Sequence, residues 1–211
     1  METIANPTLK PRKRPVQARS SVTVEAIFEA TIQVLLSHGQ QKLTTTLVAE
    51  RAGVSVGSLY QYYPNKHALL AATVERHLRH IVEAVEAACE PARGLPLEAG
   101  VALLCDAFID AKMERVEVSQ ALYGPAAELG GAAVVRAMTL RAASAIAPLL
   151  AESELKLANP PLTALYLLSA LVGPVQATLE VGPTPELIAG LRQHLYALAC
   201  GYLRALAQPA P

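Results

Sequence analysis

The sequence has no tryptophan and only two phenylalanines among its 211 residues, and only 17% of its residues are charged. A core must therefore be built mainly from alanine, leucine and valine, and a hydrophobic content of 52% supplies enough of them. No segment alternates apolar and polar residues with a period of two. The composition therefore predicts a globular all-α protein of packed helices.

The motifs that mark most enzymes and metal proteins are also missing. The sequence contains no glycine-rich phosphate loop, no Gly-x-Ser-x-Gly turn and no CxxC pair, and its three cysteines lie far apart. We therefore expect no enzymatic activity, no catalytic residues and no cofactor. His77 and His80 share a helix face and could bind a metal with His194, but no third ligand stands at a fixed spacing. We expect solvated histidines and no metal site.

Targeting and membrane segments are not expected either. The first 15 residues have no apolar stretch after their charges, as a secretory signal would. Residues 157–179 carry no charge and are long enough to cross a bilayer, but Pro160, Pro161, Gly173 and Pro174 interrupt them. We expect a buried or interface helix there, no membrane partner, and a cytoplasmic protein.

The net charge of zero conceals an asymmetry. Residues 1–82 carry ten Lys and Arg against five Asp and Glu, whereas the remainder carries eight against thirteen. A basic N-terminal third indicates a nucleic-acid partner. We predict that residues 1–19 form a flexible basic arm, which either enters a minor groove of DNA or only adds diffuse attraction to it. The arm residues concerned are Lys10, Arg12, Lys13 and Arg14.

Helical periodicity, interrupted by glycine and proline, divides the rest of the chain. A first helix is predicted from Ser20 to Gly39, followed by two short helices within 44–63 and a long one from Lys66 to about Pro91. Further helices are predicted at about 97–118, 125–156, 161–180 and 185–207.

Residues 44–63, TTTLVAERAGVSVGSLYQYY, have the pattern of a helix-turn-helix. Ala49 is small where two helices would cross, and Gly53 accepts the positive φ that the turn needs. Thr44 and Ser55 can cap the two helices. Two core helices joined by a glycine turn are the alternative reading. The caps, the upstream helix and the basic arm occur together, which favours DNA binding.

The stretch TTTLVAERAGVSVGSLYQYYPNKHALL resembles the DNA-binding domain of TetR-family transcriptional regulators, of the TetR/AcrR type. The residues that carry the resemblance are Ala49, Gly53, Val54, Ser55, Gly57, Leu59, Tyr60, Tyr62 and Lys66, whereas Tyr63 stands where phenylalanine is commoner. The resemblance implies an N-terminal three-helix helix-turn-helix domain at residues 20–80. A C-terminal helical ligand-sensing and dimerisation domain would follow at residues 81–211.

The resemblance also implies how DNA would be bound. A homodimer would place the second short helix of each subunit in a major groove of double-stranded palindromic operator DNA. Ser55 would start that helix at the groove. The residues implied to face the bases are Val56, Gly57, Ser58 and Gln61, of which Gln61 can pair with adenine. Those implied to contact phosphates are Thr44, Thr45, Tyr60, Tyr62 and Lys66, although core packing alone also accounts for tyrosines.

For the C-terminal region, the resemblance implies a dimer interface and a pocket for an unknown small-molecule effector. The leucines of the last two predicted helices suit an interface between subunits, with burial inside one subunit as the alternative. The candidate pocket residues are Asp106, Asp110, Met113, Tyr123, Tyr166, Ser169 and Gln176. The predicted function is a ligand-responsive homodimeric repressor. The alternative is a TetR-like helical adaptor or interaction protein without sequence-specific DNA binding.

Overall fold

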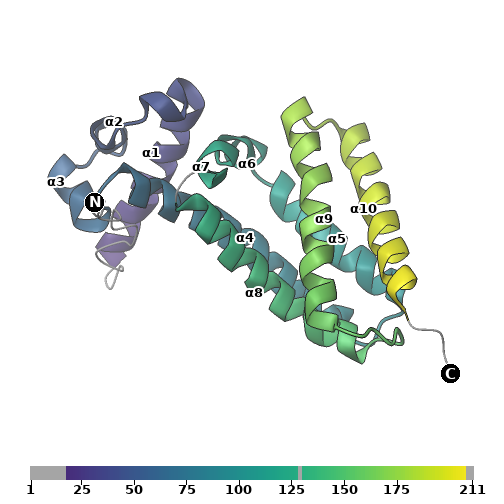
Figure 1. The fold of residues 1–211 in the computed structure, drawn as a ribbon. Helices are drawn as coiled ribbons and strands as arrows, with labels where there is room; N and C mark the ends of the chain where they lie inside the picture. The colour runs from purple at the N-terminus through teal and green to yellow at the C-terminus, as the bar shows by residue number, and fades with distance from the viewer. Residues whose placement is uncertain (1–17, 128–129, 208–211) are drawn as a thin grey trace, which may run out of the picture. The chain divides into compact units, whose positions relative to one another are not determined.

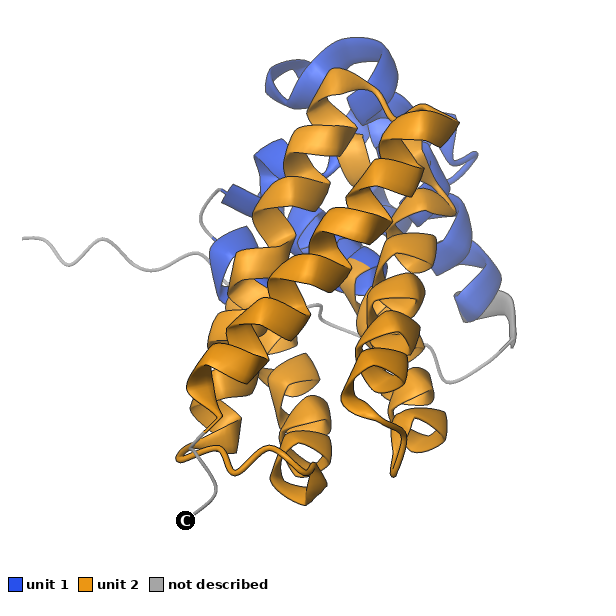
Figure 2. Cartoon of the chain, turned by 90° about the vertical axis from the view of Figure 1, so that its right-hand side faces the viewer, with its two compact units in different colours: residues 1–77, 121–135 blue, residues 78–120, 136–211 orange. Residues whose placement is uncertain are grey.

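The computed structural model describes residues 18–127 and 130–207 (Figure 1). Every regular element within these residues is an α-helix, so the all-α prediction is confirmed. The chain divides into two compact units, of which the first comprises residues 1–77 with 121–135 and the second residues 78–120 with 136–211 (Figure 2).

The first unit contains helices α1 (Ala18–Lys42), α2 (Thr45–Arg51) and α3 (Val56–Tyr62), the first turns of α4 (Lys66–Ala92), and α7 (Tyr123–Ala127). Helix α1 packs against α2, and α2 packs against α3. The core of the unit is aliphatic, and its fully buried side chains include Ile27, Ile32, Leu43, Val48 and Leu59. Gly39 interrupts α1 with a φ of 74°, at the residue where the sequence predicts that helix to end.

The second unit contains the rest of α4, together with α5 (Leu97–Met113), α6 (Val116–Ala121), most of α8 (Gly131–Glu152), α9 (Pro160–Val181) and α10 (Pro185–Leu206). Helices α9 and α10 lie side by side, and α10 also packs against α5 (Figure 1). Asn159 and Thr184 cap the two helices, and each cap precedes a proline at the start of its helix.

Two of the predicted helices are each divided in the structure. The predicted helix at 97–118 is α5 followed by α6, and the turn between them is closed by the Ser119 hydroxyl, which donates to the Lys112 carbonyl over 2.9 Å. The predicted helix at 125–156 is α7 followed by α8. Gly130 has a φ of 95°, and a Cβ at Gly131 would collide with the carbonyl oxygen of Pro125. A continuous helix is impossible with that backbone.

Two helices of the second unit are apolar over a length that could span a bilayer. Helices α8 and α9 have stretches with a mean hydropathy of 1.4 and 1.5. Core helices of water-soluble proteins can be equally long and apolar. Helix α9 directs a stripe that includes Leu167, Leu171 and Leu179 into the interior of its own unit. The apolar character of α9 therefore has an explanation in protein packing.

Candidate nucleic-acid interface and apolar cavity

The turn between α2 and α3 is fixed by backbone geometry. Gly53 has a φ of 65°, as the sequence predicts, and its N–H donates to the Glu50 carbonyl over 3.1 Å. The Val54 N–H donates to the Ala49 carbonyl over 3.0 Å. These two bonds form the Schellman arrangement that ends a helix with a glycine in the left-handed region. Ala49 is fully buried, so α3 leaves α2 at a packed crossing.

Both short helices begin at the predicted caps. The Thr44 side chain accepts a hydrogen bond from the Leu47 N–H over 3.1 Å, and the Ser55 side chain accepts one from the Ser58 N–H over 3.0 Å. The hydroxyl oxygens of Ser55 and Ser58 are also within 2.8 Å of each other. Each cap satisfies a backbone donor that a helix start otherwise leaves without a partner.

Helix α3 has one buried side and one open side. Leu59 is fully buried, whereas Gly57 and Gln61 are exposed and Val56 and Ser58 are half-buried. A Cβ on Gly57 would meet only the Ser55 hydroxyl, at 3.8 Å. The four residues expected to face DNA bases therefore lie on the part of α3 that the packing of the first unit leaves accessible.

Among the expected phosphate contacts, Thr45 and Tyr60 are coupled to each other. Their hydroxyl oxygens are 3.1 Å apart, which joins the start of α2 to the middle of α3. Thr45 is buried, while Tyr60 is 41% exposed. Tyr62 is half-buried, and its ring centroid lies 6.4 Å from that of Tyr63. Burial raises the pKa of Tyr63, whose ring belongs to the core.

Lys66, at the start of α4, holds the end of α1. Its ammonium group donates to the Gln40 carbonyl over 2.8 Å. Because an ammonium group has three N–H donors, this bond leaves others available for a phosphate. The predicted arm residues, Lys10, Arg12, Lys13 and Arg14, lie outside the described residues.

Arg51 and Arg76, which are not among the predicted site residues, stabilise the same unit. Arg51 on α2 donates to the Gln33 side chain of α1 over 2.6 Å. Arg76 on α4 forms an ion pair with Glu25 and lies over the Phe28 ring, 4.2 Å from its centroid. These contacts join residues 18 and 51 positions apart in the sequence, and no local motif announces them.

The second unit encloses an apolar cavity of about 90 Å³. Its walls come from α4, α5, α8, α9 and α10 and include Val85, Phe108, Leu149, Leu168 and Leu203. The seven candidate pocket residues are not among those that line it. Apolar positions at helical spacing look the same in sequence whether they fill a core or surround a space, so sequence reasoning had no signal for this cavity.

Four of the seven candidate pocket residues belong to α5 or to the first unit. Asp106 and Asp110, on α5, both form ion pairs with Arg192 of α10, and Arg192 donates to Asp106 over 2.5 Å. Met113 lines an open hollow on the surface, together with Asp110. Tyr123, half-buried, belongs to the first unit.

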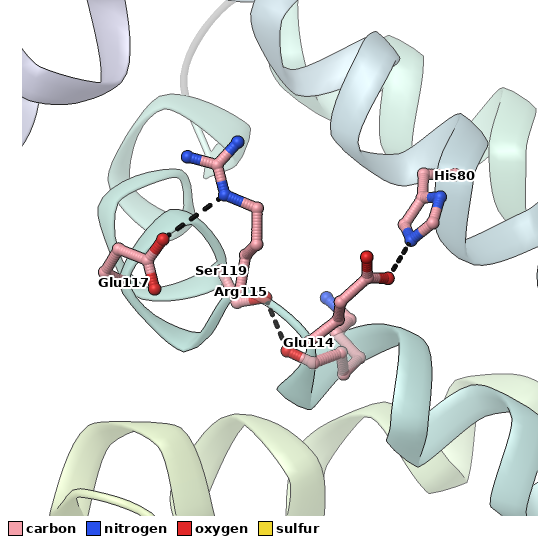
Figure 3. A network of polar contacts seen from close by, with 6 residues as sticks. His80, Glu114, Arg115, Glu117 and Ser119 are labelled. Atoms are coloured by element: carbon pink, nitrogen blue, oxygen red, sulfur yellow. Dashed lines mark hydrogen bonds and ion pairs between the residues drawn. The ribbon is translucent and has the colours of Figure 1, made fainter. Parts of the chain in front are cut away.

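Residues at that hollow take part in a polar network between α4 and the end of α5. Figure 3 shows Glu114 reaching His80 on α4, with the two side chains 2.6 Å apart, while Arg115 pairs with Glu117 at the start of α6. His80 is therefore solvated and paired. His77, in contrast, is buried, so the expectation that both histidines are solvated is wrong for His77. Among the described residues, no cluster of histidine, cysteine and acidic side chains is arranged to hold a metal ion.

The last three candidate pocket residues, Tyr166, Ser169 and Gln176, are on α9. Tyr166 is 58% exposed, the Ser169 hydroxyl donates to the Leu165 carbonyl of its own helix, and the Gln176 side chain donates to Glu180. These three residues occur at intervals of three and seven, so they share one face of the helix.

The same face of α9 and one face of α10 expose large apolar side chains. They are Leu162, Tyr166 and Val172 on α9, with Leu187 and Leu198 on α10. Gly173 on α9 and both Gly190 and Gly201 on α10 have open space where a Cβ would lie. We define the exposed apolar side chains and these three glycines as the α9/α10 face. Single exposed apolar residues are ordinary, but a continuous surface of them marks an interaction site.

Two family descriptions match the chain. "Bacterial regulatory proteins, tetR family" matches residues 27–73, and "Tetracyclin repressor-like, C-terminal domain" matches residues 96–203. The first match contains the helix-turn-helix, and the second contains the apolar cavity residues from Leu97 to Leu203 and both helices of the α9/α10 face. Together the two matches include most residues of both compact units.

Similarity in sequence to individual curated proteins spans about a third of the chain, whereas similarity in structure extends over most of it. The nucleoid occlusion factor SlmA of Actinobacillus pleuropneumoniae is 38% identical over 71 residues, which are 33% of this chain and 33% of that protein. A solved TetR-family structure from Mesorhizobium loti covers 91% of this chain and 100% of its own, with a TM-score of 0.71 and 19% identity. A TetR transcription regulator from Haloarcula marismortui covers 89% and 100%, with a TM-score of 0.67 and 21% identity.

Proposed function

Since this chain belongs to the TetR family of bacterial regulatory proteins and is thus a DNA-binding transcriptional regulator, we propose that it is a ligand-responsive repressor. It acts as a homodimer on a palindromic operator, is not an enzyme, and works in the cytoplasm. The observation that carries the proposal is the open side of α3, a capped helix whose other side is fixed in the core by Leu59.

In the proposed complex, α3 enters the major groove. The Gln61 amide pairs with an adenine, which offers an acceptor and a donor in the geometry of an amide group. Val56 contacts bases through its methyl groups, the Ser58 hydroxyl hydrogen-bonds to a base edge, and Gly57 lets the backbone approach closely. The N–H groups at the start of the helix that Ser55 caps point towards the DNA.

Phosphate contacts fix the register of α3. The hydroxyl groups of Thr44, Thr45, Tyr60 and Tyr62 and the ammonium group of Lys66 supply the donors. Thr45 and Tyr60 are already bonded to each other, so both hydroxyls are held in place before DNA arrives, and the one that accepts in this bond keeps its proton for a phosphate. The basic arm, residues 1–19 with Lys10, Arg12, Lys13 and Arg14, adds attraction to the duplex.

Dimerisation uses the α9/α10 face. Two copies related by a two-fold axis would bury the exposed leucines, Tyr166 and the three glycines in a four-helix bundle. Two copies of α3 then reach half-sites about one duplex turn apart, roughly 34–36 Å, or somewhat more. An effector bound in the second unit shifts the equilibrium between dimers that fit the operator and dimers that do not.

Selection from a random pool of DNA duplexes tests the proposal. The full chain should enrich a palindromic sequence, bind it with two chains per duplex, and lose affinity steeply as salt concentration rises. Binding of all duplexes with equal affinity, or of none, would instead support a helical adaptor or interaction protein without sequence-specific DNA binding.

A further inference from the structure

The cavity of the second unit is lined almost wholly by carbon atoms. Its walls include Val85 and Ala92 from α4, Phe108 from α5, Leu149 from α8 and Leu168 from α9. No charged side chain of the described residues lines it. Transfer of a charge into such a site, without a partner, costs far more free energy than a hydrophobic contact returns.

The cavity offers two weakly polar side chains. The Ser153 hydroxyl donates to the Leu150 carbonyl over 2.7 Å, so its proton is engaged while its oxygen can still accept a hydrogen bond. Cys105 also lines the cavity, and burial raises the pKa of its thiol to about 12. The thiol is therefore uncharged at physiological pH, and neither group can neutralise an ion.

Among the residues that line the cavity, the most exposed lies in the loop between α4 and α5. Leu95, in that loop, lines the cavity and is also 45% exposed. Arg93, two residues earlier, is paired with both Glu90 and Glu152. These two carboxylates already offset the charge of the guanidinium group, so the Arg93 side chain does not draw anions towards the cavity.

We propose that this cavity binds an uncharged, mainly hydrocarbon small molecule, which enters beside Leu95 and places at most one hydrogen-bond donor near Ser153. The inference rests on the proposed ligand response and names the chemical class of the effector. The volume of about 90 Å³ is of the order of the ~150 Å³ engineered apolar cavity that binds benzene, so the buried part is one ring or a short chain. Helix α4 supplies part of the wall and begins at Lys66, directly after the helix-turn-helix.

The class of ligand is tested with a dye and three competitors of the same chain length, one uncharged and two charged. The uncharged one-ring dye 4-(dimethylamino)benzonitrile should bind the full chain saturably, with a change in fluorescence. At pH 7.5, 1-octanol should displace the dye at a concentration about tenfold or more below that needed for octanoate or octylammonium. Absence of saturable dye binding overturns the site, and equal or better displacement by either ion overturns the class.

Two substitutions on the same helix locate the site. Leu149→Phe fills the cavity and should weaken dye binding about tenfold or more, whereas Leu140→Phe, at a 48% exposed position outside the cavity, should not change it. The thermal midpoint of each variant shows whether it is folded. Ser153→Ala, which leaves the hydrocarbon wall intact, should weaken displacement by 1-octanol about threefold to tenfold and leave displacement by octanoate unchanged. Equal dye binding by all variants overturns the assignment.

The DNA-binding proposal can fail separately. A chain that binds the dye and 1-octanol as described but selects no palindrome retains the cavity inference and loses the regulator proposal. A chain that selects a palindrome but does not bind the dye saturably retains the regulator proposal and loses the cavity inference. Release of the selected duplex by 1-octanol, and not by octanoate, would show that a ligand of the cavity controls DNA binding.

Discussion

The two units are held together in different ways. In the first, named polar groups close in sequence fix short helices: Thr44 and Ser55 cap them, and Gly53 turns the chain between them. In the second, long apolar helices pack against one another, and ion pairs such as that of Arg141 with Glu86, 55 residues apart, join them at the surface. The first arrangement is rigid around one exposed helix, while the second leaves a cavity and an exposed apolar face. The first unit is thus suited to recognising DNA through one fixed helix, whereas the second has the cavity for which ligand binding is proposed.

The largest effect is expected from breaking the α9/α10 face. Leu198→Glu places a charge at a 51% exposed position on that face, where burial in a dimer would leave the charge without a partner. The variant should have the mass of one chain, 22.3 kDa, in light scattering, and its affinity for the selected duplex should fall about 100-fold or more as the second half-site contact is lost.

Leu140→Glu is the matched control, because Leu140 is similarly exposed but lies on α8. It should leave both the mass and the affinity unchanged. A Leu198→Glu chain that remains dimeric would assign dimerisation to another surface.

Gln61→Ala tests the first unit at the level of one base pair. Gln61 is exposed in the structure, so its loss should change the free energy of unfolding by less than about 0.5 kcal/mol. Binding to the selected duplex should weaken by about 1–3 kcal/mol for each half-site contact, and the preference for adenine at one position should disappear. Gln193→Ala, at an exposed position of α10, is the control. A uniform loss of affinity for all sequences would make Gln61 a phosphate contact.

The same difference between the units decides how much of the structure the sequence could predict. The caps at Thr44 and Ser55 and the turn at Gly53 depend on residues within a few positions of one another, and all three are confirmed. The bond between Thr45 and Tyr60 and that between Lys66 and Gln40 join residues 15 and 26 positions apart, so local patterns contain no trace of them.

In the second unit, the last two predicted helices are confirmed, the predicted helices at 97–118 and 125–156 are each divided, and the cavity that the helices surround was not predicted. Thr184 before Pro185 correctly marks the start of α10. The cavity depends on whether side chains from five helices fill the space between them, and periodicity reports only which face is apolar. Most of the candidate pocket residues are predicted because they are polar or aromatic residues on apolar helices. Two of them, Asp106 and Asp110, form ion pairs with Arg192 and do not line the cavity.

A pH series on Lys112 probes the packing of the second unit. Lys112 is 93% buried, and burial lowers its pKa from 10.5 to about 8. Between these two values the unfolded chain binds a proton that the folded chain lacks, so this residue makes folding more favourable as pH rises from 8 towards 10.5. Below pH 8 the charged form is buried at a cost.

Lys112→Met should therefore be more stable than the unchanged protein by about 1–3 kcal/mol at pH 7.5, and the difference should shrink as pH approaches 10.5. Urea unfolding at both pH values measures this. Groups such as Cys105, whose thiol pKa is raised, titrate in both proteins and cancel in the difference. Lys156→Met, at an exposed position, should show no such change. A difference independent of pH would mean that folding does not lower the pKa of Lys112 and that this residue stays protonated in the folded protein.

The smallest effect is expected from Gly57→Ala, which should strengthen folding but weaken DNA binding. Gly57 lies in α3 with ordinary helical geometry, and nothing but the Ser55 hydroxyl comes within 4 Å of a Cβ placed there. The fold of the first unit therefore does not require glycine at this position, and Gly57→Ala should stabilise the protein by about 0.5–1 kcal/mol. If the backbone of α3 approaches the bases, the added methyl group should nevertheless weaken binding to the selected duplex about tenfold. Gly100→Ala, in α5 of the second unit, meets only an ordinary contact at 3.6 Å and should stabilise folding without affecting DNA. Should Gly57→Ala strengthen folding and leave affinity unchanged, α3 would not bring its backbone to the groove, and glycine at this position would lose its proposed role in DNA recognition.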